Sequence, residues 1–408
     1  MSFLDINRAQ TAADNGLWSI VTDVLQDLSL TQLEHPQAVL DLALQVLLEG
    51  NADRQWDIAK IIPKLGEIAV QPLLAIANDN EIDLEDRWVA VRILGEFSQP
   101  EVVMALVGLI TRDEDLELTT IATSALTKIG IPAIAALTDL LATAERLVAV
   151  KILAQIRHSR TIEPLLQVVD DIDPQIRTLS IEALGSFHDA RIPPILLTKL
   201  TDVAASVRKA AAVALSLRSD LAAELNLLQR LRPLLFDLDL AVCGATAIGL
   251  ARLPDPEVVA VLTAVLLSTH TPDRLRSPII LALGWIGTRA AIDSLMAMLN
   301  LAPELAPEIL TSIGKTEREQ VYASESLVGY LRLNQLHPAI VKQEIAAALG
   351  NLGNPQTVSD LVQLLADPDD RVRLYTIAAI SKLSPTVPQS SLESIDRVGV
   401  LHKLQIDT

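Results

Sequence analysis

The sequence predicts an all-α fold, a right-handed α-solenoid of about eleven helix pairs stacked as an α-α superhelix. Three observations predict it. A motif recurs about every 31 residues along most of the 408-residue chain. Half of the residues are apolar but only 3% are aromatic, a composition typical of thin, close-packed helical layers. Within each repeat, two apolar stripes with helical spacing flank a turn.

The repeat is marked by a basic residue eight positions before a small residue, which itself follows an aliphatic one. A period this short means that one unit cannot bury its own apolar face and has to stack on its neighbours. We therefore expect one elongated domain. The clear copies run from Arg87 to Gly95, Arg146 to Ala154, Arg177 to Gly185, Arg208 to Ser216, Arg276 to Gly284, Lys342 to Gly350 and Arg373 to Ser381, and fainter copies place the small residue at Gly66, Thr127, Gly249 and Thr311.

The unit from Ile162 to Phe187 shows how one repeat is built. Apolar residues fall at helical spacing on both sides of a helix-breaking segment, residues 170–174. In that segment Asp173 can cap the incoming helix while Pro174 fixes φ. The basic residue in the first turn of the second helix, Arg177 here, is expected to reach an acidic group or a carbonyl in its own turn or the next one. We call the basic residue at this position of each repeat its ladder residue. We predict that the ladder residues stabilise the fold and do not bind a partner.

The repeat pattern fails near both ends and in one internal gap. Residues 1–50 are predicted to form an N-terminal cap with two helices, over about 6–28 and 36–48. Residues 51–384 are predicted to form the repeat solenoid, and residues 385–408 a loosely ordered tail. The widest gap, from Thr311 to Gly350, contains the polar segment 317–334, in which we expect an over-long helix that projects from the stack.

The pattern Asp-x-x-x-x-Arg-x-x-(Ala/Ser)-x-x-Ala-Leu-Gly resembles the HEAT repeat, and its short period resembles the phycobilisome-lyase (PBS lyase HEAT-like) subtype. Residues 176–187, 207–217, 275–286 and 372–383 carry it best. The resemblance implies a solenoid that holds a protein partner. Members of this family include bilin lyases, chaperones of phycobiliproteins and general scaffolds. A cyanobacterial relative that partners IscA-type iron–sulfur assembly proteins is similar in size and composition. The implied partner is therefore a phycobiliprotein subunit or an iron–sulfur assembly protein.

Charge and composition argue against several other kinds of partner. The net charge is −18, and no cluster of Lys and Arg is present to release counterions from phosphates, so neither nucleic acid nor an anionic membrane surface is expected. The sequence contains no run of eighteen apolar residues, so membrane insertion is not expected. A single cysteine and an N-terminus without a secretory pattern favour a cytoplasmic location. The acidity serves either solubility or attraction of a basic partner.

No constellation of catalytic or metal-binding residues is found in the sequence. The six histidines are scattered, none stands at i and i+4 with another, and no His-Glu dipeptide occurs. Cys243 lies two residues after Ala241, the ladder position we assign to its repeat, where other repeats place core residues. We expect a buried, inert thiol. No catalytic residue, metal or resident cofactor is therefore predicted.

The second helix of each unit is expected to line a concave groove. Residues one, five and nine positions after the ladder position lie along one edge of that helix. The edge is polar up to Ser186 and then becomes apolar in three consecutive repeats. Exposed apolar surface of this kind usually marks a binding site, although covered core residues would give the same pattern. The apolar candidates for partner binding are Val213, Leu217, Val242, Leu250, Leu281 and Trp285.

Three further candidates lie in the N-terminal half. Trp88 and Arg92 stand one turn apart on the predicted edge, and Lys151 lies on the same edge two repeats later. Stacking on the indole and bidentate pairing with the guanidinium are suited to a planar or carboxylate-bearing ligand. The alternative is that Trp88 packs against the previous repeat.

Two functions from different classes remain open. The first is a non-catalytic scaffold or chaperone that binds a protein partner in the groove. The second is a bilin lyase or isomerase, in which the Trp, Arg and Lys edge grips a propionate-bearing phycobilin as a transient ligand. The repeat subtype supports the second, and the lack of a catalytic constellation favours the first.

Overall fold

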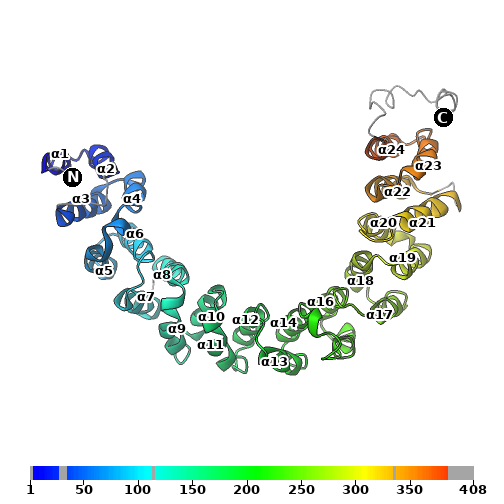
Figure 1. Ribbon diagram of the computed structural model, residues 1–408, viewed down its shortest axis with the longest axis horizontal. Coiled ribbons are helices and arrows are strands. Elements are labelled where there is room, and N and C mark those ends of the chain that lie inside the picture. The colour runs from blue at the N-terminus through cyan, green and yellow to red at the C-terminus, as the bar shows by residue number, and fades with distance from the viewer. Residues whose placement is uncertain (1–2, 27–34, 113–114, 334–336, 385–408) are drawn as a thin grey trace. The chain divides into compact units, whose positions relative to one another are not determined.

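A computed structural model describes residues 3–26, 35–112, 115–333 and 337–384 (Figure 1). Throughout these residues the chain forms α-helices, short 3-10 helices and connections, and no strand. The chain divides into two compact units, Met1–His188 and Asp189–Thr408. The predicted all-α helical repeat fold is confirmed. The predicted tail, residues 385–408, lies outside the described residues.

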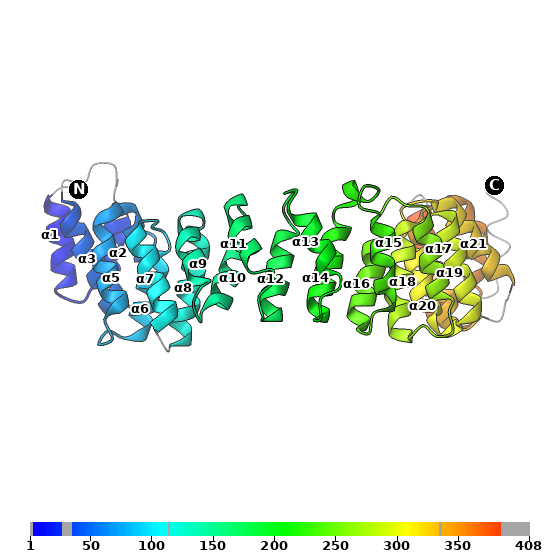
Figure 2. The ribbon, with the colours of Figure 1, turned by 90° about the horizontal axis from the view of Figure 1, so that it is seen from below.

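Unit 1 is a stack of helix pairs that begins with a helical N-terminal segment (Figures 1 and 2). The helix expected over 6–28 is two helices, because Gly16 adopts a left-handed φ of 66° that ends the first one. The helices are α1 (Phe3–Ala13), α2 (Trp18–Gln26), α3 (Pro36–Glu49), α4 (Ala52–Ile58), α5 (Val70–Asn78), α6 (Leu84–Leu94), α7 (Pro100–Arg112), α8 (Leu116–Ile129), α9 (Ile134–Leu140), α10 (Arg146–Gln155), α11 (Ile162–Gln167) and α12 (Pro174–Leu184).

Unit 2 repeats the same pairing. Its even-numbered helices pack on one another in sequence and form one layer, and the odd-numbered helices form the other (Figures 1 and 2). The helices are α13 (Ile192–Lys199), α14 (Ala205–Ser216), α15 (Leu227–Leu231), α16 (Leu240–Leu250), α17 (Glu257–Leu266), α18 (Asp273–Ile286), α19 (Arg289–Leu301), α20 (Ala306–Ile313), α21 (Gln320–Leu333), α22 (Ala339–Leu352), α23 (Val358–Leu364) and α24 (Asp370–Leu383).

The prediction of a projecting helix over 317–334 is wrong. In its described part this segment forms α21, which packs against α22 and α19 as the odd-numbered helix of an ordinary pair. The hydroxyl of Tyr322 donates to Asp293 Oδ1 of α19 at 2.6 Å, and Tyr330 stacks on His337 with ring centroids 4.6 Å apart. The polar residues of the segment thus anchor it to the stack.

The recurring small residue allows neighbouring even-numbered helices to approach closely. A Cβ atom added at Gly95 would lie 3.0 Å from Ala125 Cβ, and one added at Gly350 would lie 2.8 Å from Ala379 Cα. A Cβ atom added at Gly314, just after α20, would lie 2.7 Å from Ala348 of α22, so Gly314 and not Thr311 is the small residue of its repeat. Larger side chains at these positions would push the helices apart.

The ladder residues bind where the sequence predicts. Arg177, Arg208 and Arg373 each donate through Nη1 to the carbonyl six residues earlier, in all three cases at 2.8 Å. Arg208 also reaches the next repeat, where it donates to both carboxylate oxygens of Asp237, at 2.7 and 2.6 Å. These two bonds lower the pKa of Asp237 and raise that of Arg208. The ladder therefore links adjacent repeats.

The Asp237→Asn variant is expected to lower the free energy of unfolding at pH 7 by about 1–2 kcal/mol, because a charge-assisted pair with Arg208 is lost. The folded-state pKa of Asp237 is depressed, so its stabilisation is fully present above the unfolded pKa, about 3.9, and disappears as the pH falls through the folded value. Urea unfolding at pH 7 and at progressively lower pH should therefore show wild type and variant converging in acid.

Asp189→Asn provides the control. Hydrogen bonds from Arg191 lower the pKa of Asp189 to about 2, but the pair is exposed and screened by water, so its loss should leave the urea midpoint nearly unchanged. If the difference in free energy of unfolding between wild type and Asp237→Asn stayed the same in strong acid, the stabilising pair of Asp237 with Arg208 would be contradicted.

Candidate partner-binding site

Apolar side chains are exposed along one edge of the even-numbered helices in unit 2. Leu217, just past α14, is 54% exposed, and Leu281 and Trp285 of α18 are 39% and 53% exposed. Val213 of α14 is partly exposed. Leu281 and Trp285 lie one helical turn apart, so they present one continuous apolar strip. Their exposure excludes the alternative that they are core residues.

Val242 and Leu250 do not belong to this edge, and the prediction that they are exposed is wrong. Both side chains are fully buried. The half-buried residue that faces outward on α16 is Ile248. The error is one of register, because the ladder position of this repeat is Cys243 and not Ala241.

Cys243 occupies the place that arginine takes in neighbouring repeats. Its Sγ donates to the carbonyl of Asp237, six residues earlier, at 3.2 Å. It stands four residues after the N-cap Asp239, as Arg373 stands four residues after the N-cap Asp369. The Asp-Leu-Asp sequence before α16 is the signal for this register, because it matches the Asp-Pro-Asp sequence before α24.

The thiol of Cys243 is unsuited to chemistry. It is buried, as predicted, and this burial raises its pKa despite the hydrogen bond to the carbonyl of Asp237. A thiol that resists ionisation is a poor nucleophile and a poor metal ligand. Among the described residues, no group of three or more His, Cys, Asp and Glu side chains is placed to hold a metal ion.

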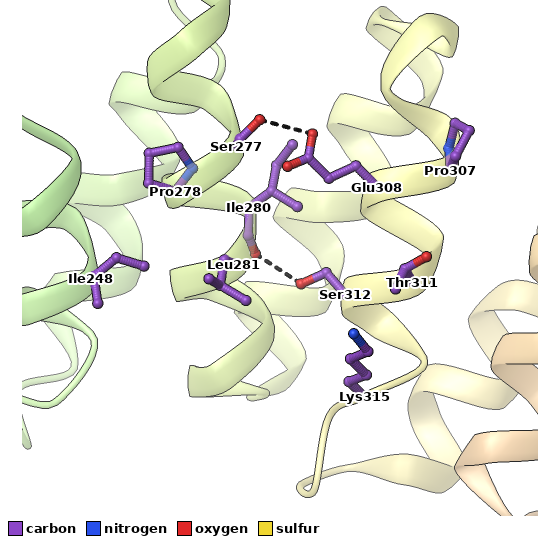
Figure 3. Close-up of a pocket in the computed structure, with 10 residues that line it drawn as sticks. All are labelled: Ile248, Ser277, Pro278, Ile280, Leu281, Pro307, Glu308, Thr311, Ser312 and Lys315. Carbon is purple, nitrogen blue, oxygen red and sulfur yellow. Dashed lines mark hydrogen bonds between the residues drawn. The ribbon is translucent and has the colours of Figure 1, made fainter. Parts of the chain in front are cut away.

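An open pocket of about 690 Å³ lies along the exposed edge where α16, α18 and α20 meet (Figure 3). Ile248, Leu281 and Pro278 form much of its apolar wall on the α16 and α18 side. Gly244 lets α16 approach α18 here, since a Cβ at this position would lie 3.3 Å from Pro278 Cγ. The full lining is Ile248, Ser277, Pro278, Ile280, Leu281, Pro307, Glu308, Thr311, Ser312 and Lys315.

The polar groups of this pocket are mostly satisfied within the chain. Ser277 donates to Glu308 Oε2 at 3.0 Å, and Ser312 donates to the carbonyl of Ile280 at 3.0 Å (Figure 3). Glu308 and Lys315 supply one charge of each sign. The arrangement suits an apolar side chain of a partner, with polar groups at the pocket that can fix its orientation.

A smaller cavity of about 270 Å³ lies in unit 1, between α4, α6 and α8. It brings together Trp88 and Arg92, as the edge analysis predicts, but adds Trp56 and Lys128 in place of Lys151. Lys151 is exposed on α10 and does not line it. Sequence reasoning missed Trp56 because the faint repeat with its small residue at Gly66 lacks a basic residue and puts its ladder position at Ile58, after Trp56. The lining is Trp56, Trp88, Arg92, Ile121, Ser124, Ala125 and Lys128.

The Arg92 guanidinium stacks on indole. Its Cζ lies 3.6 Å from the ring centroid of Trp56 and 5.9 Å from that of Trp88. Burial lowers the pKa of Arg92, and the nearby charge of Glu96 partly offsets this. Trp88 is half-buried, so it contributes both to packing and to the cavity wall.

Comparison with known families identifies the repeat. HEAT repeats match residues 70–148, 143–216 and 226–306, which together make up more than half of the chain. A PBS lyase HEAT-like repeat matches residues 341–367. A search of curated proteins found no match. In the described residues, no single helix is long and apolar enough to cross a membrane; α8 and residues 131–140 reach that length only as a pair bent by 112°.

Solved structures with a similar fold include importin beta and the karyopherin Kap121p. Importin beta crystallised in polyethylene glycol has a TM-score of 0.55 at 12% identity, with 93% of this chain and 65% of that chain covered. Importin beta in ammonium sulfate gives 0.53 at 14% identity, covering 93% and 59%. Kap121p bound to the extreme C-terminus of the phosphatase Cdc14p gives 0.51 at 15% identity, covering 92% and 53%. This chain thus spans between about half and two thirds of their length.

The register of α16 is tested by comparing Val242→Ser with Ile248→Ser. Val242→Ser should lower the free energy of unfolding by about 2–4 kcal/mol, because it leaves a cavity and buries a hydroxyl. Ile248→Ser should cost less, roughly 1 kcal/mol, since the native side chain is only half-buried. Urea denaturation of both variants measures the difference. Equal losses of unfolding free energy in the two variants, or a larger loss in Ile248→Ser, would show that α16 does not bury Val242 and expose Ile248.

Proposed function

Because the chain belongs to the HEAT-repeat family, we propose that it is a non-catalytic scaffold or chaperone that binds a protein partner along α14, α16, α18 and α20. The observation that carries the proposal is the exposed apolar strip of Leu281 and Trp285 on α18, with the pocket beside Leu281 and the exposed Leu217 just past α14. Large exposed apolar patches are rare on proteins that act alone.

The strip has the energetic character of a docking surface. Burying a leucine side chain that is otherwise exposed contributes about 1.5–3 kcal/mol, and tryptophan is among the residues that most often dominate binding energy. A pocket of about 690 Å³ falls in the size range that accepts anchoring groups. The three exposed side chains and the pocket therefore support docking of a protein partner on this surface.

Structures of similar fold support a role in protein binding. Kap121p has been crystallised with the extreme C-terminus of Cdc14p. The likeness at 15% identity concerns the fold, so the partner of this chain has to come from its own features.

The partner we propose is a phycobiliprotein subunit or an IscA-type iron–sulfur assembly protein, in the cytoplasm. The match of residues 341–367 to a PBS lyase HEAT-like repeat supports the first, and the resemblance in size and composition supports the second. Under this proposal the chain itself uses no cofactor.

The double variant Leu281→Ser with Trp285→Ser tests the docking surface. It should weaken the complex by roughly 2 kcal/mol or more, about thirtyfold in Kd, while the melting temperature changes little because both side chains are exposed. Calorimetric titration with purified phycobiliprotein subunits and with the purified assembly protein measures the affinity.

Phe236→Ser is the matched control. Phe236 is 71% exposed but ends the 3-10 helix between α15 and α16 and does not line the pocket, so its loss should leave the affinity unchanged. Equal weakening by Phe236→Ser, or wild-type affinity in the double variant, would disprove docking on α14–α20.

The alternative function is a bilin lyase or isomerase, and the grouping of Trp56, Trp88, Arg92 and Lys128 around one cavity favours it. Mixing the purified protein with phycocyanobilin and recording the visible spectrum separates the two functions. For a scaffold we expect an unchanged bilin spectrum and no pigment in the protein fraction after gel filtration. A shifted spectrum that stays with the protein, and is lost in Arg92→Gln, would favour the lyase.

A further inference from the structure

We propose that the unit 1 cavity lined by Trp56, Trp88, Arg92 and Lys128 is a receptor for a single carboxylate group carried beside a small apolar side chain. This site differs in chemistry from the apolar strip of unit 2. It is argued from its own geometry and stands whether or not α14–α20 bind a protein.

Stacking holds the Arg92 guanidinium in a defined plane. A distance of 3.6 Å between Cζ and the Trp56 ring centroid places the cation directly on the face of the indole. A guanidinium held flat in this way keeps its N–H groups at the edge of the plane, where a carboxylate can accept two parallel hydrogen bonds. The receptor is therefore preorganised before any ligand arrives.

Arg92 has no carboxylate partner within the described part of the chain. The nearest candidate, Glu96, is four residues after Arg92, just past the end of α6, and forms an ion pair with Lys128 of α8. Glu96 thus neutralises Lys128, and the charge of Arg92 remains available to a ligand.

A second stacked arginine shows what such a residue looks like when it is already satisfied. Arg289 lies over the ring of Tyr322 at 5.2 Å, and its Nε donates to Glu319 at 3.0 Å. The stacking partner is aromatic in both cases, but only Arg289 has a carboxylate supplied by the chain itself. The comparison supports our proposal that the carboxylate for Arg92 comes from another molecule.

The cavity sets the size and charge of the ligand. Its volume of about 270 Å³ and the apolar side chains of Ile121 and Ala125 suit a group about as large as a leucine side chain. One available guanidinium matches a singly charged carboxylate better than a doubly charged phosphate, particularly in a chain of net charge −18. A C-terminal carboxylate and an acidic side chain share this chemistry.

Fluorine NMR of the full chain labelled with 5-fluorotryptophan tests the proposal. The sequence has four tryptophans, and Trp56→Phe and Trp88→Phe assign the two relevant signals. N-acetyl-leucine should shift the signals of Trp56 and Trp88 with a Kd on the order of 1 mM, and leave Trp285 unchanged. N-acetyl-leucinamide, which lacks the charge, should shift neither. N-acetyl-glutamyl amide carries its carboxylate in the side chain. Whether it or N-acetyl-leucine binds more tightly decides between an acidic side chain and a C-terminal carboxylate as the natural ligand.

Three variants identify the group responsible. Arg92→Gln should weaken N-acetyl-leucine binding by at least about tenfold, and Arg92→Lys by several-fold because lysine keeps the charge but loses the planar fork. Arg289→Gln, the matched control, should bind as wild type. Melting temperatures check that each variant folds. Should Arg92→Gln fail to fold, the comparison of acid with amide on the wild-type protein, together with Arg92→Lys, decides the question.

Three results would overturn the proposal. The first is an equal response of Trp56 and Trp88 to the acid and the amide. The second is no response of these signals to either carboxylate probe. The third is wild-type affinity in Arg92→Gln.

Discussion

In four repeats, a bond from the ladder side chain to the carbonyl six residues earlier fixes how the second helix of the repeat is rotated. Arg177, Arg208 and Arg373 make this bond with a guanidinium, and Cys243 makes it with a thiol. Because the bond holds the helix by its first turn, it decides which residues face the core and which face solvent several turns later. On α16, the burial of Val242 and the outward position of Ile248 both agree with Cys243 making this contact.

The two candidate sites use the same scaffold for different chemistry. In unit 2 the edge residues are apolar and the polar groups of the pocket bond to the chain itself, so recognition there comes from excluding water. In unit 1 a charged group is stacked between aromatic rings and lacks a partner among the described residues, so recognition there depends on charge and direction.

Most of the fold could be predicted from the sequence, because period, ladder and small residues each report a contact made within one repeat or between neighbours. The predictions were wrong where the ladder residue or the small residue of a repeat could not be recognised. The ladder residue of α16 is a cysteine, so a search for basic residues displaced its register by two positions. The repeat that contains Trp56 has no basic residue, and its assigned ladder position, Ile58, left Trp56 off the predicted edge. The segment that forms α21 looked over-long because Gly314 was not recognised as the small residue of its repeat.

The small residues have a further consequence within unit 2. Interhelical distances of roughly 8–10 Å are set by the side chains at the contact, and Gly314 and Gly350 hold α20, α22 and α24 at close spacing. These glycines therefore define the pitch at which successive edges are presented to a binding partner. A methyl group added at one of them would act as a wedge and change the spacing without altering any exposed residue. Selectivity for the periodicity of a partner can thus be encoded in atoms that the partner never touches.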